Sequence, residues 1–478
     1  MWLRGIAVAA LLAACARVPA DDIRARGTLR WGGDVQGGEP YVSQAGSELV
    51  GFEVEIADGL ARRLGVRAEF VQNDWQTLIP SLERGDFDVA LNGVEVTDFR
   101  QKRVAFTRPY YAFTETLVVR RETNGVHGLR DLRGQRVGTL DGSLARDLLR
   151  AEPGVELVLY EGVEEPYIDL ERGRLAAVLL DNIIAARYGL PRETLRAAGT
   201  AGEGVYAIAV RPDRAALLRA VDDALAGMMR DGELRRILER WNLWDDRQAA
   251  LPAVGPMAAE GGLDTTFTLG YLPLFLRGAA FTIVISTLAM ALAIVGGLAL
   301  SIGRRYGGRL VRSAAGVYVE VLRGTPVLLQ LYVLYYGLAP ILTLDAFTAA
   351  VVGLGLNYAA YESELYRAGL DAVPVAQTEA ALALGMSRWL ALRRIVLPQA
   401  VRIALPGVAN DFIALLKDSS LVSVITVIEL TKQMTITAVD VRGWLGPGLL
   451  CAALYLGLSY PLSRLARRLE RRLAPAPA

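Results

Sequence analysis

Five long apolar segments in the C-terminal half constrain this chain more than any other feature. They are Tyr271–Ile302, Val317–Leu338, Leu344–Leu370, Ile403–Leu430 and Leu445–Leu465. Most are near or above the ~20 residues that an α-helix needs to cross a bilayer. Several buried helices of this length are unusual in a soluble protein. The sequence therefore predicts an all-α transmembrane domain of about five helices over residues 270–470.

Arginines gather in alternate loops between these segments. They are Arg304, Arg305, Arg309 and Arg312 after the first segment, Arg388, Arg393 and Arg394 between the third and fourth, and Arg464, Arg467, Arg468, Arg471 and Arg472 after the fifth. Such loops are expected to be cytoplasmic. Five crossings then place the C-terminus in the cytoplasm and the N-terminal domain outside, as expected for a multi-pass protein of a bacterial inner membrane.

The first 20 residues have the composition of a secretory signal. An apolar run begins at Ile6, follows Arg4, and ends in Leu-Ala-Ala before Cys15. This ending resembles the lipobox of bacterial lipoproteins, which implies cleavage before Cys15 and lipidation of its thiol. An ordinary signal peptide and an uncleaved anchor remain alternatives. The second cysteine, Cys451, lies in an apolar segment, so the two cysteines do not form a disulfide framework.

Residues 28–245 have the pattern of an α/β domain. Strand-like runs alternate with stretches whose apolar residues have helical spacing. The predicted helices are Phe52–Leu64, Thr77–Arg84 (ended by Gly85) and Leu217–Leu238. Such alternation predicts sheets covered by helices on both faces. Residues 246–266 contain Pro252, Pro256 and two adjacent glycines, and are expected to form a flexible linker spanning on the order of 25 Å.

A motif lies between the third and fourth apolar segments, in the predicted cytoplasmic loop 375–400. It consists of Glu379, Ala380 and Ala381, then Gly385, and then Ile395, Leu397 and Pro398. The spacing resembles the EAA signature of ABC importer permeases. The resemblance implies that this loop forms a short coupling helix that docks on a separate ATPase subunit, and Gly385 permits the sharp turn after it.

Two further stretches narrow this resemblance. Val321–Pro326 and Leu416–Leu421 are similar to signatures of the permeases for polar amino acids, of the histidine, glutamate, glutamine, arginine and opine type. Four ionisable residues are candidates for the translocation path: Glu362, Glu364, Lys417 and Asp418. A capping role at the membrane surface remains open for Lys417 and Asp418, and a lipid-headgroup or interhelical role for Glu362.

The chain lacks the sequence of an ATPase. Its lysines are Lys102, Lys417 and Lys432, and none follows a glycine as a phosphate-binding loop requires. ATP and magnesium are therefore expected on a partner ATPase, and no cofactor in this chain. Five segments make half of such a pore by the family resemblance, which implies a second permease copy, expected as a homodimer.

The N-terminal domain resembles the family 3 periplasmic solute-binding proteins. The similarity lies in Leu49–Glu53, Leu78–Leu82, Asn92–Arg100, Val104–Thr107 and Gly138–Ser143. It implies the two-lobed periplasmic-binding-protein type II fold, with an amino acid held between the lobes. Lobe 2 is expected at about residues 122–204, with the chain crossing near Leu117–Arg121 and again near Tyr206–Val210.

The family resemblance also implies a clamp for a zwitterion. Arg100 occupies the position that binds the α-carboxylate, with backbone donors near Gly93 and Ser143. Asp181 is placed where the family binds the α-ammonium. The alternatives are a surface ion pair of Arg100 with Asp98 and a helix N-cap role for Asp181.

Side-chain selectivity is expected from Asp34, Trp75, Asn92 and Glu95. Two carboxylates and a tryptophan suit a cationic side chain, although Gly37–Tyr41 departs from the family's aromatic pattern. A basic amino acid is one candidate, and the exact substrate is left open. Glu95 stands where many relatives have a small hydroxyl residue.

The sequence thus predicts one subunit of an amino-acid importer rather than an enzyme. A net charge of +1 gives no indication of nucleic-acid binding. The single histidine, His127, cannot form a histidine metal cluster. The alternatives are an amino-acid-gated channel and a receptor that uses the same capture domain. The coupling loop has no role in a channel, and a receptor needs a signalling module.

Overall fold

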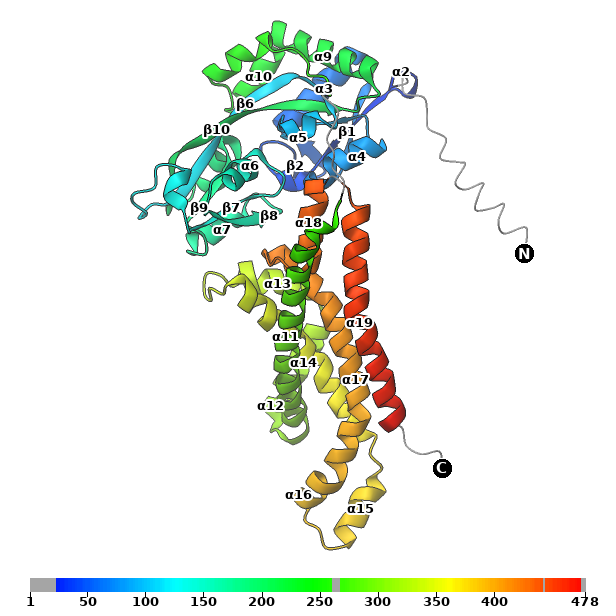
Figure 1. Ribbon diagram of the computed structural model, residues 1–478. Helices are drawn as coiled ribbons and strands as arrows, with labels where there is room; N and C mark the ends of the chain where they lie inside the picture. Colours follow the sequence, from blue (N-terminus) through cyan, green and yellow to red (C-terminus); the bar gives the residue numbers. More distant parts are fainter. Residues whose placement is uncertain (1–22, 260–266, 442, 474–478) are drawn as a thin grey trace, which may run out of the picture. The chain divides into compact units, whose positions relative to one another are not determined.

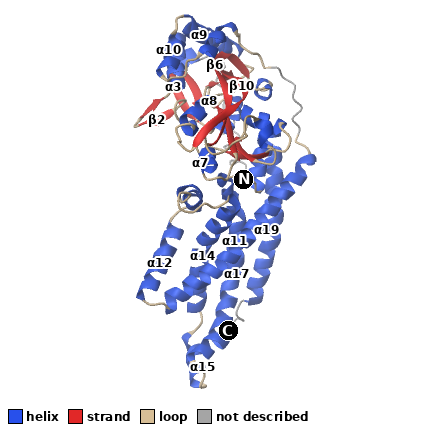
Figure 2. Ribbon diagram, turned by 90° about the vertical axis from the view of Figure 1, so that its left-hand side faces the viewer, coloured by secondary structure: helices blue, strands red, loops and turns tan. Residues whose placement is uncertain are grey.

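The computed structural model describes residues 23–259, 267–441 and 443–473. The chain divides into two compact units, Met1–Asp264 and Thr265–Ala478, which we describe separately. All the strands of the described chain lie in the first unit, and the second unit is helical (Figures 1 and 2). The predicted signal segment and Cys15 lie outside the described residues.

One eight-stranded sheet organises the first unit, in the order β4-β1-β5-β10-β6-β9-β7-β8. Its strands are β1 (Thr28–Gly33), β4 (Arg67–Gln72), β5 (Val89–Ala90), β6 (Ala105–Arg120), β7 (Arg136–Leu140), β8 (Glu156–Tyr160), β9 (Ala177–Asp181) and β10 (Leu195–Val210). A short hairpin, β2 (Ser43–Ala45) with β3 (Glu48–Val50), stands apart from it.

The long antiparallel strands β6 and β10 join the two halves of this sheet. Near one end β10 pairs with β5 through Ala209 and Val210, whereas the other half of β6 pairs with β9 from Glu115 onward. The passage from one half to the other therefore lies before Glu115. The predicted first crossing at residues 117–121 is too late, because those residues already belong to the second half.

Helices of the first half follow the predicted spacing in part. Helix α3 (Phe52–Leu64) buries Phe52, Ile56, Leu60 and Leu64, which have helical spacing, and ends at Gly65. Helix α4 (Leu78–Arg84) ends at Gly85. The predicted helix 217–238 is instead two helices, α9 (Ala215–Arg230) and α10 (Glu233–Arg240). Gly232, with φ of 73°, separates them, since a left-handed residue cannot continue a right-handed helix.

The second half of the sheet carries α6 (Leu144–Ala151) and α7 (Glu165–Glu171). Short helices α2 (Ile23–Arg26), α5 (Asp98–Gln101) and α8 (Asn182–Ile184) complete the unit. In this half, Leu149 of α6 belongs to a buried apolar cluster with Leu117, Val137 and Leu179 of the sheet.

The first part of the predicted linker is folded onto the first unit. Asp246–Ala253 forms a 3₁₀ helix. The side chain of Gln248 is buried and bonds to both backbone groups of Ala112, at 2.8 and 2.9 Å. Met257 pairs with Phe106 through two backbone hydrogen bonds of 2.8 Å. The predicted linker is therefore ordered at Asp246–Ala253 and at Met257, because their polar groups find partners on β6.

The second unit is a helix bundle. Its helices are α11 (Leu272–Tyr306), α12 (Arg309–Gly324), α13 (Val327–Tyr332), α14 (Ala346–Asp371), α15 (Val375–Ala383), α16 (Arg388–Ala391), α17 (Leu397–Asp418), α18 (Leu430–Val441) and α19 (Leu445–Leu473). Figure 1 shows α11, α14, α17 and α19 side by side. Gly297 brings α11 close to α14, where an added Cβ would meet the backbone of Ser363 at 3.0 Å.

Two described helices are long and apolar enough to cross a membrane, Leu269–Tyr306 and Leu445–Arg468. A third span is possible if Arg309–Gly324 and Val327–Gly337 act together, although they meet at 110°. The break follows from Thr325 and Pro326, because a residue before proline avoids the helical region. Helices α14 and α17, with 26 and 22 residues, are long enough but carry more ionisable side chains. Five crossings remain a prediction.

Candidate functional site

A cleft in the first unit collects residues from both halves of the sheet. It is lined by seven of the eight residues predicted from sequence: Asp34, Trp75, Asn92, Gly93, Glu95, Ser143 and Asp181. The eighth residue, Arg100, stacks on Trp75, with its guanidinium over the indole ring at 4.9 Å from the ring centroid. The structure therefore brings the predicted residues together at one place.

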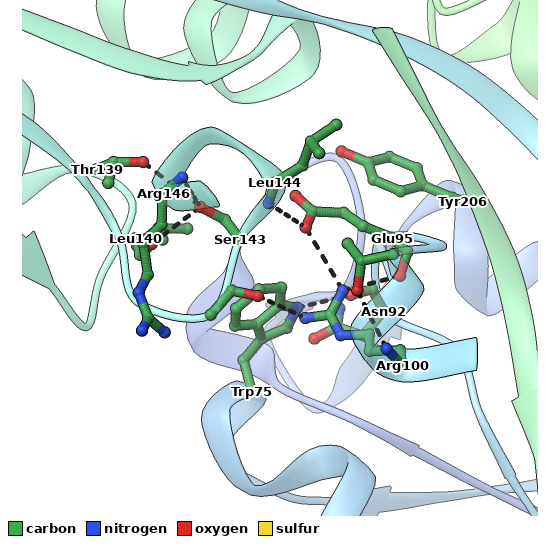
Figure 3. A network of polar contacts seen from close by, with 12 residues as sticks. Trp75, Asn92, Glu95, Arg100, Thr139, Leu140, Ser143, Leu144, Arg146 and Tyr206 are labelled. Atoms are coloured by element: carbon green, nitrogen blue, oxygen red, sulfur yellow. Dashed lines mark hydrogen bonds and ion pairs between the residues drawn. The ribbon is translucent and has the colours of Figure 1, made fainter. Parts of the chain in front are cut away.

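Arg100 is buried, and its partners come from the cleft rather than the surface. Its Nη1 donates to the backbone oxygen of Glu95 at 3.0 Å and lies 3.5 Å from the Glu95 carboxylate, and its Nη2 donates to Gly142 at 3.2 Å. Burial lowers the pKa of Arg100, and the charge of Glu95 opposes that shift. The alternative of a surface ion pair with Asp98 is therefore wrong, because the guanidinium points inward (Figure 3).

Glu95 joins the two halves of the cleft. It precedes α5, and its carboxylate accepts the backbone N–H of Leu144, the first residue of α6, at 2.7 Å. Burial raises the pKa of Glu95 to about 7, against the opposing effects of Arg100 and this hydrogen bond. The carboxylate thus lies between a guanidinium and a helix N-terminus, where negative charge is favoured.

Ser143 and Asp181 both cap helices. Ser143 Oγ accepts the N–H of Arg146 at 3.2 Å and donates to Leu140 at 2.9 Å. Asp181 Oδ1 accepts the N–H groups of Ile183 and Ile184 at 2.8 and 3.0 Å. The N-cap role considered for Asp181 is confirmed. Its position on the wall of the cleft keeps a ligand role open, and burial raises its pKa.

Asp34 and Trp75 are fixed by one network on the other wall. Asp34 Oδ2 accepts the backbone N–H of Trp75 at 3.0 Å, and its Oδ1 accepts the amide of Gln72 at 2.9 Å. The indole N–H of Trp75 donates to the backbone of Asn92 at 3.0 Å. Gly93, with φ of 55°, donates its N–H to the buried Glu53 at 2.6 Å. The hydrogen bonds of the Trp75 backbone and indole N–H groups fix the indole ring in the wall of the cleft.

Among the cleft residues that were not predicted from the sequence, three bear polar groups next to Asp181: Tyr41, Glu115 and Tyr206. The two tyrosine hydroxyls lie 3.0 Å apart, and that of Tyr41 donates to Asp181 at 3.0 Å. Glu115 is fully buried on β6, directly opposite Asp181 in the strand register. A signal for Glu115 existed, since it is the one charged residue in the stretch Tyr110–Val119.

The Glu115 side chain is the least exposed of the buried acids that line the cleft. Neither of its oxygens has a hydrogen-bond partner of ordinary geometry. Burial raises its pKa well above the usual range, with further contributions from the charges of Glu95 and Asp181, and the backbone N–H of Ala145 opposes this shift. A buried carboxylate with so few partners is costly, so this group is suited to receive a cation.

The EAA motif forms a helix and a turn at the surface of the second unit. Glu379, Ala380 and Ala381 lie on α15, and Gly385, with φ of 81°, makes the turn before α16. Ile395 lies in the π-helical turn Leu392–Val396, and Leu397 and Pro398 begin α17. Apolar side chains stand exposed around this turn, with Leu384 83% and Trp389 69% accessible. Such exposure of large apolar groups is typical of a docking surface.

The four candidate path residues occupy different environments. Glu362 is buried at the contact of α14 with α11, beside Gly297. Glu364 forms ion pairs with Arg304 and Arg367. Asp418 accepts the hydroxyl of Tyr358 at 2.8 Å, and Lys417 is exposed.

Only Asp418 of these four lines a described groove of about 490 Å³ in the bundle. The groove is bordered by the 323–327 break, by Asn357, Tyr358 and Tyr361 of α14, and by Asp411 and Ala414 of α17. The structure therefore does not bring Glu362, Glu364, Lys417 and Asp418 to one place.

Comparison with known proteins assigns the two units to two families. Residues 32–243 match the bacterial extracellular solute-binding proteins of family 3, and residues 293–475 match the binding-protein-dependent transport system inner membrane components.

Curated relatives cover the two units separately. The chain is 40% identical to the glutamine transport system permease protein GlnP of Escherichia coli (strain K12) over 209 residues, which are 42% of this chain and 94% of that protein. It is 34% identical to the arginine transport system permease protein ArtQ of Bacillus subtilis (strain 168), over 44% of this chain and 97% of that one. Its first unit is 30% identical to the ABC transporter arginine-binding protein 1 of Escherichia coli (strain K12), over 41% of this chain and 83% of that one.

A similar solved structure is that of an ancestral arginine-binding protein bound to arginine. It is 32% identical, with a TM-score of 0.43, and the match covers 45% of this chain and 98% of that one.

Proposed function

This chain belongs to the amino-acid ABC transporter permeases and carries a family 3 solute-binding domain, so it serves amino-acid import, and we propose that it captures a cationic amino-acid-type solute. The solute-binding domain, which we call the capture domain, spans residues 28–245, and the permease domain spans 270–470. ATP hydrolysis belongs to a partner subunit, and the proposal gives this chain no catalytic residue. The channel and receptor alternatives are not favoured by these relatives.

The charges of the cleft support a cationic solute. Glu95, Glu115 and Asp181 are buried carboxylates on its walls, and the face of Trp75 borders the same space. In a desolvated site an ammonium or guanidinium gains from such carboxylates and from the indole face. Asp34, Asn92, Gly93 and Ser143 shape the walls that carry these groups.

One observation carries the importer function: the chain that forms this cleft also has the exposed turn at Gly385 between α15 and α16, which we call the coupling turn. The turn presents Leu384 and Trp389 to solvent beside the motif residues of α15. We infer that a helix of the partner ATPase covers these apolar groups. Gly385 sets the direction of the turn, and Ile395, Leu397 and Pro398 connect it to α17.

For the permease we propose a path along the groove at Tyr358 and Asp418. Helix α14 contributes Tyr358 and α17 contributes Asp418, so movement of α17 by the coupling turn would change this groove. Glu362 and Glu364 fit helix contacts better, since one is packed against α11 and the other pairs with two arginines. Lys417 is exposed beside Asp418 and remains a candidate.

The topology completes the proposal. The arginine-rich loops support a cytoplasmic C-terminus and coupling turn, and hence a capture domain on the periplasmic side. A homodimer would complete the pore with two copies of the groove. Lipidation of Cys15 would be an additional anchor.

Uptake in proteoliposomes tests the importer function. The full chain is reconstituted with the ATPase that co-purifies with it, with ATP inside the vesicles and labelled arginine, lysine, agmatine, glutamine and glutamate in turn outside. We expect ATP-dependent uptake of a cationic solute, and none without the ATPase. ATP-independent currents carried by inorganic ions would instead indicate a channel, and glutamate uptake alone would defeat the cationic solute.

A further inference from the structure

The guanidinium of Arg100 already holds a carboxylate supplied by the chain itself. Glu95 Oε2 lies 3.5 Å from Nη1 of Arg100 and accepts the N–H of Leu144 at 2.7 Å (Figure 3). A guanidinium and a helix N-terminal N–H are the two kinds of donor that an incoming α-carboxylate would use. In this cleft the Glu95 carboxylate contacts one donor of each kind, and the backbone oxygens of Glu95 and Gly142 accept from Nη1 and Nη2 of Arg100 at 3.0 and 3.2 Å.

The rest of the cleft offers no replacement for these donors. Among the described residues that line it there is no lysine or arginine. Glu115 and Asp181 lie opposite each other on β6 and β9, and the Glu115 carboxylate has no hydrogen-bond partner of ordinary geometry. A ligand with a free carboxylate would therefore face four buried acids, Asp34, Glu95, Glu115 and Asp181, without a lysine or arginine among the described lining residues to bind it.

We propose that this cleft selects cationic amines or guanidines that lack a free carboxylate, and that Glu95 is the residue that sets this specificity. Glu95 takes the place of the ligand's α-carboxylate, and Glu115 with Asp181 receives the cationic group. The proposal rests on the proposed capture of a cationic solute and changes the expected ligand from a cationic amino acid to its decarboxylated or amidated form.

Pairs of ligands that differ by one carboxylate test the proposal. Binding is measured by isothermal titration calorimetry on the full chain in lipid nanodiscs, with agmatine against arginine, cadaverine against lysine, and arginine amide against arginine. We expect at least one pair in which the ligand without the carboxylate binds more than about 10-fold tighter, since juxtaposed like charges in a buried site are strongly unfavourable. The comparison of arginine amide with arginine can be made on the wild-type chain, and the two ligands share the same α-carbon geometry.

Substitution of Glu95 provides the specific control. In Glu95→Ser we expect the preference to reverse, because Arg100 and the Leu144 N–H become free for an α-carboxylate. Glu95→Gln keeps the side-chain size and is expected to shift the ratio in the same direction. Glu48→Gln on the exposed strand β3 is the matched control and should leave the ratio unchanged.

The outcomes separate this proposal from the importer function. If the wild-type chain binds arginine and lysine as tightly as their counterparts, or if both Glu95 variants keep the wild-type ratio, the proposal is wrong while amino-acid import stands. If no amine and no amino acid binds to the wild-type chain or its variants, the proposal and the capture of a cationic solute both fail.

Discussion

At the scale of single residues, buried acids determine the behaviour of the capture domain. Glu53, Glu95, Glu115 and Asp181 are all buried within the first unit, and burial raises the pKa of each. Of these, Glu53 is held by the N–H of Gly93 at 2.6 Å and by the hydroxyl of Tyr110. Its ionised form is still disfavoured in the folded state, which links folding to pH.

The sign of this linkage follows from the pKa of Glu53. It is raised from 4.5 to about 7 on folding. Between these values the folded chain binds more protons than the unfolded chain, so stability falls as pH rises from 4.5 to 7 and stays low above it. The expected loss is on the order of 1–3 kcal/mol.

Thermal unfolding of the full chain in detergent between pH 5 and pH 8 measures this effect. We expect the capture-domain transition to move to lower temperature with rising pH, and Glu53→Gln to flatten part of that slope. Glu48→Gln is the surface control. A slope that Glu53→Gln leaves intact would show that the pKa of Glu53 is not raised in the folded chain.

At this scale, many residues of the cleft could be predicted from the sequence, but the contacts that their side chains make with one another could not. The motif from Asn92 to Arg100 contains Asn92 and Glu95, which line the cleft, and Arg100, which stacks on Trp75 next to it. That Glu95 faces Arg100 depends on the backbone turning back at Thr97, which caps α5 with its own side chain. Glu115 was missed because its neighbour Asp181 is 66 positions away in sequence and meets it only through the β6–β9 register.

At the scale of elements, breaks in helices were harder to predict than the helices. The apolar spacing continues through Gly232 and through Thr325–Pro326, so it suggested one helix where the structure has two. Both breaks have a local cause in backbone sterics, a left-handed glycine and a proline. The coupling turn was predictable because its motif includes the glycine that makes it.

The turn at Gly385 gives a prediction at this scale. An added Cβ there would meet nothing within 4 Å, yet the φ of 81° is disfavoured for alanine by about 1–2 kcal/mol. We therefore expect Gly385→Ala to reduce ATPase stimulation and uptake by changing the direction of α15, while solute binding to the capture domain stays at the wild-type level.

A matched substitution separates the turn from the general loss of a glycine. Gly457 of α19 likewise has open space around it, but lies within a right-handed helix. Gly457→Ala should therefore keep uptake near wild type. ATPase assays and uptake in proteoliposomes measure both variants, and normal coupling in Gly385→Ala would contradict the role given to the turn.

At the scale of the whole molecule, one chain holds a solute-binding domain and a permease domain. A homodimer would therefore carry two capture domains, each tethered to its own permease half at an effective concentration of roughly millimolar. Each domain should be able to deliver solute alone, because delivery does not depend on a free binding protein.

Mixed dimers test this arrangement. Copies with Glu115→Gln and Asp181→Asn are expected not to bind solute, and are joined with wild-type copies through two different affinity tags. We expect mixed dimers to bind one solute and to retain about half of the uptake, whereas doubly substituted dimers retain none. Absence of any mixed assembly after sequential tag purification would show that the chain does not pair with itself.

The segment after the capture domain has one further consequence. Gln248 and Met257 attach it to Ala112 and Phe106, and both of these lie on β6, the strand that passes between the two halves of the sheet. The last of these contacts, Met257 with Phe106, therefore fixes the chain to the half of the sheet that contains β5 before it leaves the domain. Rotation of the other half would leave this exit point in place, so each cycle of grasping and releasing can proceed without pulling on the membrane-embedded portion.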